Sequence, residues 1–201
     1  MSIRKTILGG ALLALAAVSQ LSAQANKAEI YGGYVYAKVN PIAPLPKQTA
    51  NGWVGSVTGY ATSWFGFGGE ISAVFGDVGQ EVGGGKPIHA KQYSYLFGPQ
   101  FRFVDTAKVQ TGFKFLLGGA FAQARMASGT SATQQTALAA AGYTNFDQTK
   151  FAALFAVPVD VSVSKLIAIR VEPGLYMTDF NATKQSNFRL SVGPVFRFGG
   201  K

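Results

Sequence analysis

The chain has 201 residues, of which 13% are charged, 13% are aromatic and 25 are glycine. This length suits one domain with or without a targeting segment, and the composition is too apolar for a disordered chain. The absence of cysteine excludes a disulfide framework, a thiolate metal site and a lipid anchor on an N-terminal cysteine. A single histidine leaves little material for general-base catalysis, so we expect no catalytic site, cofactor or bound metal.

Residues 1–25 have the features of a secretory signal peptide. Arg4 and Lys5 form a positive start, an apolar core follows, and Ala23-Gln24-Ala25 is a small-x-small cleavage site. A membrane anchor is the alternative, but the core is too short to span a bilayer comfortably. Residues 26–201 are then the exported domain. Removal of the signal peptide takes away Arg4 and Lys5 and lowers the net charge from +9 to +7. Because an exported protein does not meet nucleic acid, we expect this charge to face anionic lipid headgroups.

From residue 28 onward the sequence alternates between strand-like runs and polar breaks. Within each run, large apolar side chains alternate with small or charged ones at a period of two. The eight runs are Ala28–Val39, Trp53–Ala61, Phe65–Phe75, Gln92–Phe103, Val109–Arg125, Lys150–Val163, Leu166–Thr178 and Phe188–Phe198. The pattern predicts an all-β protein, an eight-stranded antiparallel up-and-down transmembrane β-barrel.

The breaks between the runs alternate long and short. The four long breaks are residues 40–50, 76–91, 126–149 and 179–186. Within the longest, Gln134–Ala141 favours one or two helical turns because alanine, leucine and glutamine are helix formers. This alternation predicts both termini and the short turns in the periplasm and the long loops outside the cell.

The large apolar faces are expected to point outward, toward lipid. In a water-soluble barrel they would point inward, but eight strands enclose a space just wide enough to be filled by side chains. That space cannot hold the aromatic face of every strand, whereas small and charged residues fit it. Aromatic residues also gather where two membrane interfaces would lie. The expected girdles are Tyr36, Trp53, Phe75, Tyr93 and Phe151 near the loops, and Trp64, Phe65, Phe67, Phe103 and Phe198 near the turns.

The opposite, lumen-facing side collects most of the charge in the strands. Its charged residues are Glu29, Glu70, Arg102, Lys114, Asp160, Arg170, Glu172, Arg189 and Arg197. An unpaired charge in a narrow lumen would be costly, so we expect ion pairs between strands. The pairs that suggest themselves are Glu29 with Arg197, Glu70 with Arg102 and Asp160 with Arg170. A salt-bridged plug is the favoured interpretation over an ion path or gate, because eight strands leave little free bore.

One motif occurs twice. Residues 98–103 read Gly-Pro-Gln-Phe-Arg-Phe, and residues 193–198 read Gly-Pro-Val-Phe-Arg-Phe. A four-plus-four duplication and convergence on one membrane-strand pattern explain the echo equally well. Proline cannot donate a ladder hydrogen bond, so Pro99 and Pro194 predict a bulge or a lost bond in these strands.

The strands at Glu29–Tyr34, Leu96–Pro99, Ile167–Arg170 and Asn187–Phe198 resemble those of small bacterial outer-membrane proteins with an OmpA-like eight-stranded β-barrel. The resemblance covers essentially all of the chain after the signal peptide and says little about activity. It implies a location in the bacterial outer membrane. It also implies insertion by the barrel-assembly machinery, which reads a C-terminal strand ending in an aromatic residue. Here three residues follow Phe198.

The most direct functional interpretation is a structural or surface-interaction barrel without catalysis. A narrow porin-like channel is one alternative. A lipid A-modifying enzyme is another, and it would need His89 and Ser94 as its catalytic pair. No carboxylate that would orient His89 is evident in the sequence, so a solvated loop histidine is favoured.

The loops and the adjacent strand ends carry an excess of positive charge. This charge could bind lipopolysaccharide phosphates or could serve solubility alone. The residues are Lys38, Lys47, Lys86, Lys91, Arg125, Lys150 and Lys184, against Asp77, Glu81, Asp147 and Asp179. We therefore expect a monomer whose partners are outer-membrane lipids and lipopolysaccharide, with the assembly machinery as a transient partner.

Overall fold

The structure is a computed structural model that describes residues 28–39, 48–78, 88–106, 108–140, 146–180 and 183–199. The expected signal peptide, residues 1–25, lies outside the described residues, as do most of the first two long breaks. In the described part, no helix has the length and apolar character needed to cross a membrane.

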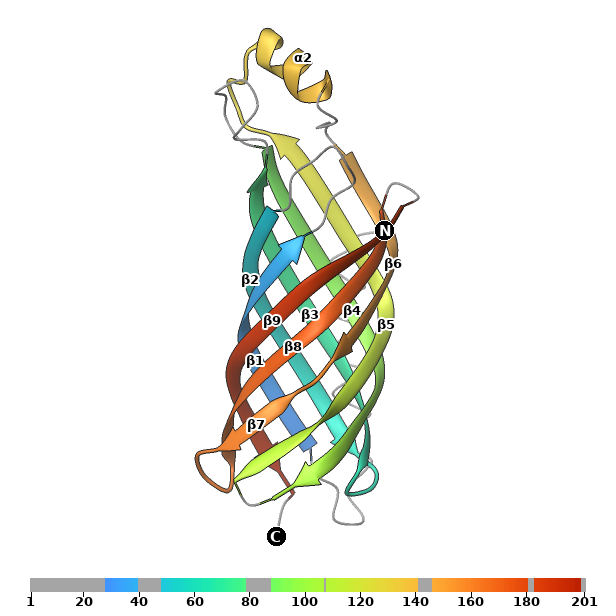
Figure 1. The fold of residues 1–201 in the computed structure, drawn as a ribbon, viewed down its shortest axis with the longest axis vertical. Helices are drawn as coiled ribbons and strands as arrows, with labels where there is room; N and C mark the ends of the chain where they lie inside the picture. Colours follow the sequence, from blue (N-terminus) through green and yellow to red (C-terminus); the bar gives the residue numbers. More distant parts are fainter. Residues whose placement is uncertain are drawn as a thin grey trace, which may run out of the picture.

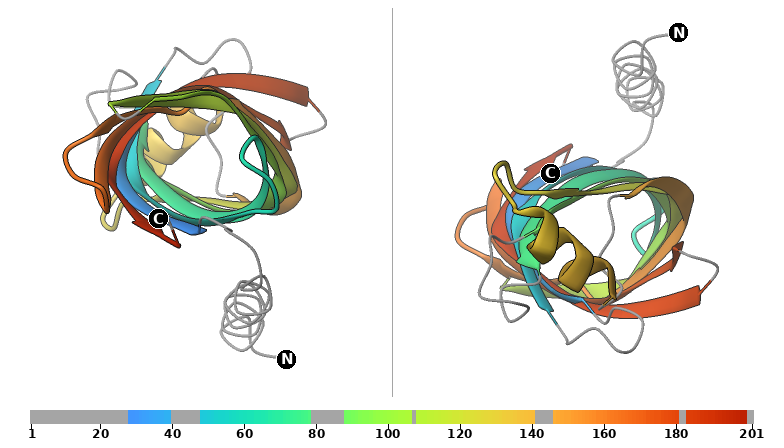
Figure 2. Two further views of the ribbon diagram at one scale, coloured as in Figure 1. Left: turned by 90° about the horizontal axis from the view of Figure 1, so that it is seen from below. Right: turned by 90° about the horizontal axis from the view of Figure 1, so that it is seen from above.

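The described chain is one closed antiparallel sheet (Figures 1 and 2). Its strands are β1 (Ala28–Val39), β2 (Gln48–Tyr60), β3 (Phe65–Val78), β4 (Ile88–Asp105), β5 (Val109–Met126), β6 (Phe146–Ala156), β7 (Val159–Ser162), β8 (Ile167–Phe180) and β9 (Thr183–Phe198). Each strand pairs with the next around the ring, and β9 pairs with β1 to close it. Because β6 and β7 both lie between β5 and β8, the nine strands fill eight positions, as predicted.

The sixth predicted strand is interrupted rather than continuous. Pro158 has no N–H to donate to the ladder, and its carbonyl instead accepts bonds from Gly112 N at 3.3 Å and Thr111 Oγ1 at 2.9 Å. Val157 N donates to the carbonyl of Pro173, 2.9 Å away. The register against β5 and β8 is unchanged across the break, so β6 and β7 act as one barrel strand.

The two ends of the barrel differ as expected, with one correction. The turn end carries the short connections and the end of β9. The loop end carries helix α2 (Ala132–Ala140), whose bounds nearly match those of the predicted helical turns (Figure 1). The prediction of a fourth long loop at residues 179–186 is wrong. β8 continues to Phe180 and β9 starts at Thr183, so that Asp179 and Lys184 lie opposite each other in the backbone ladder. Ladder bonds need only backbone groups, so polar residues can extend strands beyond the apolar band.

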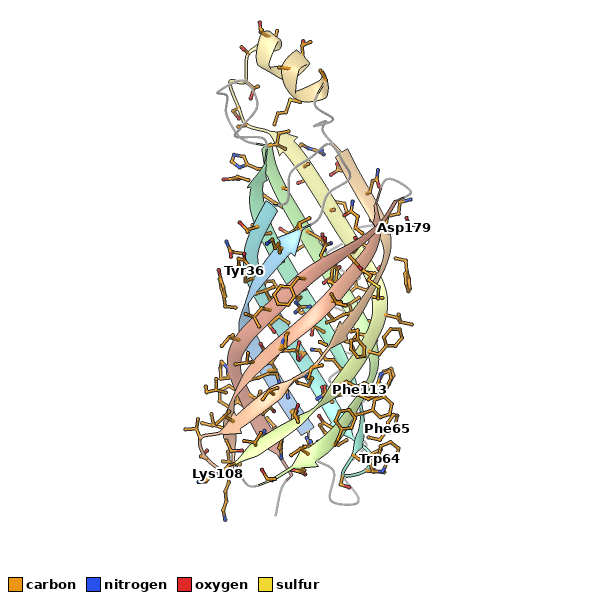
Figure 3. All side chains as sticks on the ribbon, in the orientation of Figure 1. Tyr36, Trp64, Phe65, Lys108, Phe113 and Asp179 are labelled. Carbon is orange, nitrogen blue, oxygen red and sulfur yellow. The ribbon has the colours of Figure 1, made fainter. Side chains whose placement is uncertain are left out.

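The outward face is apolar and the inward face is polar and charged. Phe67 and Phe103 are 59% and 63% exposed, whereas lumen residues such as Glu29 are only 2% exposed. Side chains project from the outer wall along its whole height, with Trp64 and Phe65 at the turn end and Tyr36 higher up (Figure 3). At the turn end Phe65, Phe101 and Phe113 form a chain of ring contacts with centroids 4.7–5.4 Å apart. This arrangement confirms the predicted transmembrane β-barrel with its apolar face outward.

Both Gly-Pro motifs interrupt a ladder without shifting its register. The β4–β5 pairing skips Gly98 and Pro99, and the β1–β9 pairing skips Gly193 and Pro194. The expected loss of ladder bonds therefore occurs at both prolines. A separate irregularity, which the sequence did not predict, is the register shift at Phe103.

Candidate functional site

The lumen holds all nine charged residues that the sequence placed there. They come from the inward faces of six strands: β1, β3, β4, β5, β8 and β9, with Asp160 added by the short strand β7. Eight of the nine are buried, and the side chain of Arg197 is 11% exposed. They divide into two groups. The turn-end cluster is Glu29, Arg102, Asp160, Arg170 and Arg197, and the central cluster is Glu70, Lys114, Glu172 and Arg189.

Two carboxylates organise the turn-end cluster. Glu29 accepts hydrogen bonds from Arg102 Nη2 at 2.6 Å and from Arg170 Nη2 at 2.9 Å. Asp160 accepts a bidentate contact from Arg170, with Nε at 2.7 Å and Nη2 at 2.9 Å, and a bond from Arg197 Nη2 at 2.9 Å. Bidentate guanidinium–carboxylate pairs are the strongest of these interactions and fix geometry as well as charge.

Aromatic and amide side chains complete this cluster. The guanidinium of Arg102 lies 4.0 Å from the ring centre of Tyr60, and that of Arg170 lies 5.2 Å from the ring centre of Tyr31. Gln100 Nε2 donates to the hydroxyl of Tyr60 at 2.5 Å. Cation–π contacts strengthen when both partners are desolvated, as they are in this lumen.

The central cluster is a four-residue chain of charges. Lys114 Nζ lies 2.6 Å from Glu70 Oε2 and 2.7 Å from Glu172 Oε1, so one ammonium joins two carboxylates. The other oxygen of Glu70 accepts a bond from Arg189 Nη1 at 2.5 Å. The cluster contains two cations and two carboxylates and is therefore neutral.

One predicted pair is present, one is a long contact and one is wrong. Asp160 pairs with Arg170, whereas Arg197 Nε is 3.7 Å from Glu29 Oε1. Arg102 reaches Glu29 instead of Glu70. The reason is the stagger between neighbouring strands. Glu70 lies opposite Leu96 on β4, and Arg102 is six residues further along β4, which places it about 20 Å from the level of Glu70.

Two small cavities lie within the described lumen. One, of about 10 Å³, lies beside the turn-end cluster and is lined by Glu29, Tyr60, Arg102 and Pro158 among others. The other, of about 20 Å³, lies on the loop-end side of the central cluster. Each has room for about one water molecule.

The outer rim holds paired polar side chains that the sequence did not reveal. His89 Nδ1 lies 2.7 Å from Asp77 Oδ1, because the register of β3 and β4 sets the two residues opposite each other. Arg125 pairs with Asp147, which also accepts a bond from Gln123 Nε2 at 3.0 Å. Asp147 lies beyond the loop-end aromatic girdle, and the bonds from Gln123 and Arg125 lower the pKa of its carboxyl below the ordinary value.

The residues considered for catalysis are not brought together. His89 is exposed on the outer wall, whereas Ser94 is buried in the lumen and bonded to Ser72 at 2.7 Å. Their odd spacing on one strand places them on opposite faces of the sheet. The structure does supply the carboxylate partner of His89, Asp77, that the sequence did not show. The described residues contain no group of acidic and histidine side chains suited to a metal ion.

Comparison with known proteins identifies the fold. The chain matches no protein-family model, and no curated protein sequence is detectably similar to it. Among solved structures, it is similar to Ail, the attachment invasion locus protein of Yersinia pestis, with 16% identity, a TM-score of 0.56, and coverage of 85% of this chain and 99% of Ail.

Two further solved structures are similar to this chain. Neisserial surface protein A has 12% identity and a TM-score of 0.59, with 87% of this chain and 98% of that protein covered. A major outer membrane protein from Thermus thermophilus has 10% identity and a TM-score of 0.55, with 87% of this chain and 100% of that protein covered. The fold is thus that of small bacterial outer-membrane β-barrel proteins, which agrees with the predicted resemblance.

Proposed function

We propose that this protein is a monomeric structural and surface-interaction barrel of the bacterial outer membrane, without catalysis, whose lumen is closed to ions. The observation that carries the proposal is the pair of charge clusters across the lumen. In them, every carboxylate has at least one cation within 2.9 Å. Eight strands enclose little more space than side chains occupy, so paired charges at this spacing leave no continuous water path.

Planar-bilayer recording tests the closed lumen. The mature protein, folded as judged by heat-modifiable gel mobility, is expected to be silent. Lys114→Ala removes the cation between two carboxylates and is expected to admit cation-selective openings. Lys108→Ala, in the exposed turn between β4 and β5, is the matched control and is expected to stay silent. Reproducible openings of the unaltered protein would favour the alternative, a narrow porin-like channel.

Cations on the outer rim support an interaction with the phosphates of lipopolysaccharide. Lys38 and Lys91 are exposed, point outward just beyond the loop-end aromatic residues, and form no ion pair within the described part of the chain. Arg125 and His89, by contrast, are engaged by Asp147 and Asp77. Ammonium groups at headgroup depth attract anionic lipid.

Binding of lipopolysaccharide to the detergent-solubilised barrel tests this partner. The double variant Lys38→Ala, Lys91→Ala is expected to bind more weakly and with less dependence on salt. The single variant Lys165→Ala, in an exposed turn at the opposite end, is the control and should bind as the unaltered protein does. Equal weakening in both variants would point to general charge attraction instead of a rim site.

A lipid A-modifying enzyme is a weaker alternative. The histidine and its carboxylate partner are present at the outer rim, but the serine that would act with them lies on the other face of β4. Mass spectrometry of lipid A from cells with and without the protein is expected to show no difference. A mass shift that disappears with His89→Ala would support the enzyme.

A further inference from the structure

The three short connections at the turn end share one hydrogen-bonded geometry. In each, a serine or threonine hydroxyl accepts a bond from the backbone N–H three residues later, and the carbonyl of that later residue accepts a bond from the N–H of the serine or threonine. The residues are Thr62 with Phe65, Thr106 with Val109, and Ser164 with Ile167, and the hydroxyl bonds measure 2.9, 2.9 and 3.1 Å. Because the turns satisfy these backbone groups themselves, they can lie against a membrane interface at little cost.

The turn between β7 and β8, residues 163–166, is apolar and leans outward from the barrel wall (Figures 1 and 2). Val163 is 71% exposed and Leu166 is 63% exposed. The turn is fixed to the next strand, because the carbonyl of Leu166 accepts a bond from Arg197 N at 2.9 Å. Turn residues that face water are ordinarily polar, and exposed apolar side chains are unfavourable there. This turn therefore indicates contact with lipid.

Two exposed lysines accompany this apolar turn. Lys165 lies within it, and Lys108 lies in the adjacent turn between β4 and β5, at the lower edge of the barrel in Figure 3. The carbonyl of Lys108 accepts a bond from Ser162 N at 2.8 Å, so the two turns are joined. Lys165 is three residues beyond Ser162, a span of at most about 11 Å. Two flexible lysine side chains at this separation can therefore reach one lipid headgroup.

The charge of these two lysines is not neutralised by the protein. Within the described part of the chain, the ion pairs at this end of the barrel involve neither of them. Asp105, the carboxylate beside the β4–β5 turn, accepts a bond from Gln110 and lies 3.6 Å from Arg102 Nη1. The third turn, between β2 and β3, carries no charge and presents Trp64, which is 56% exposed. The turn end thus has one cationic side and one neutral aromatic side.

We propose that Lys108 and residues 163–166 bind an anionic phospholipid of the leaflet at the turn end, with its phosphate at the two ammonium groups and its acyl chains on the outer wall of β7 and β8. That wall continues the apolar turn, since Val161 and Ile169 lie opposite each other and are 52% and 41% exposed. Lysine stems can follow apolar surface while their ammonium groups reach phosphate. This inference rests on the proposed place of the barrel in the outer membrane, but not on the closed lumen or the lipopolysaccharide rim.

Backbone amide chemical shifts of the mature protein in lipid nanodiscs test this site. Phosphatidylglycerol replaces phosphatidylcholine in steps at constant ionic strength. The amide signals of Lys108, Lys165 and Leu166 are expected to shift, and to saturate, as the phosphatidylglycerol fraction rises. The amide signals of Ser63 and Trp64 should stay in place, because their turn has the same hydrogen bonds but no cation.

Matched lysine variants, each checked for folding by heat-modifiable gel mobility, separate a lipid site from general charge attraction. Lys165→Gln should raise the phosphatidylglycerol fraction needed for half of the shift about fivefold, and the double variant Lys108→Gln, Lys165→Gln should abolish saturation. Lys165→Arg keeps the charge and should titrate as the unaltered protein does. The double variant Lys38→Gln, Lys91→Gln removes the same charge at the opposite end and should leave the turn-end shifts unchanged.

Four results would overturn the proposal. Equal shifts at all three turns would show general attraction to a charged surface. The absence of any shift in an inserted barrel would leave the apolar turn to a protein partner instead of a lipid. Identical shifts from soluble glycerol phosphate in phosphatidylcholine nanodiscs would show a site for a free anion. Failure of the folded barrel to enter nanodiscs would contradict the proposed membrane function itself, and this site with it.

Discussion

Replacing Glu29 with glutamine tests whether paired charges hold the barrel together. Glu29 is 2% exposed and receives hydrogen bonds from Arg102 at 2.6 Å and Arg170 at 2.9 Å. Glutamine keeps the shape and one acceptor oxygen but removes the charge. Three guanidinium groups would then share Asp160 and the partly exposed Asp105.

The expected loss of stability follows from the burial of this pair. Removing one partner of a buried ion pair costs about 3–5 kcal/mol, because the remaining charge stays buried without compensation. Asp77→Asn is the matched control, since it removes one carboxylate from a half-exposed pair with His89. Exposed pairs contribute about 1 kcal/mol or less, so the control should be nearly as stable as the unaltered protein.

Urea titration of the barrel in lipid vesicles measures the difference. Trp53 and Trp64, the two tryptophans of the chain, are exposed on the outer wall, so their fluorescence reports withdrawal from lipid on unfolding. The Glu29→Gln midpoint should fall well below that of Asp77→Asn. If the two variants unfold at the same urea concentration, the turn-end cluster does not stabilise the barrel and the reasoning is refuted.

Three further predictions concern the wall and the rim. Gly98→Ala should destabilise the barrel, because the added Cβ would lie 2.1 Å from a carbonyl oxygen of β5. In Gly32→Ala the added Cβ meets nothing within 4 Å, so this control should keep the unaltered midpoint in the same urea titration. Leu117→Arg places a charge on the lipid-facing wall and should lower the free energy of unfolding by about 2–4 kcal/mol if residue 117 lies near the bilayer midplane. An almost unchanged free energy of unfolding would indicate that this face does not contact lipid. The pKa of Asp147 is lowered by hydrogen bonds from Gln123 and Arg125, so its contribution to stability is present above the ordinary aspartate pKa and lost as the pH falls through the lowered value. Gln123→Ala should raise that pKa in an NMR titration, and an unchanged value would contradict the assigned cause.

The sequence was enough to predict which charged residues face the lumen, but not which of them form ion pairs with one another. Which residues face the lumen depends only on alternation within each strand, and all nine were identified. Which residues meet depends on the stagger between strands and on side chains that cross the lumen. Glu70 on β3 reaches Arg189 on β9, and Glu29 on β1 reaches Arg102 on β4, between strands that are not neighbours. No local pattern encodes such contacts.

The sequence by itself determined the number of barrel strands, their inward and outward faces and the aromatic ends, because a period of two is a local property of each run. The tertiary structure decided the rest. It showed the break at Pro158, the extension of β8 and β9 beyond the apolar band, the partner of His89 and the cavity beside Arg189. These features arise when staggered strands close into a ring, since closure fixes which distant groups lie at the same depth.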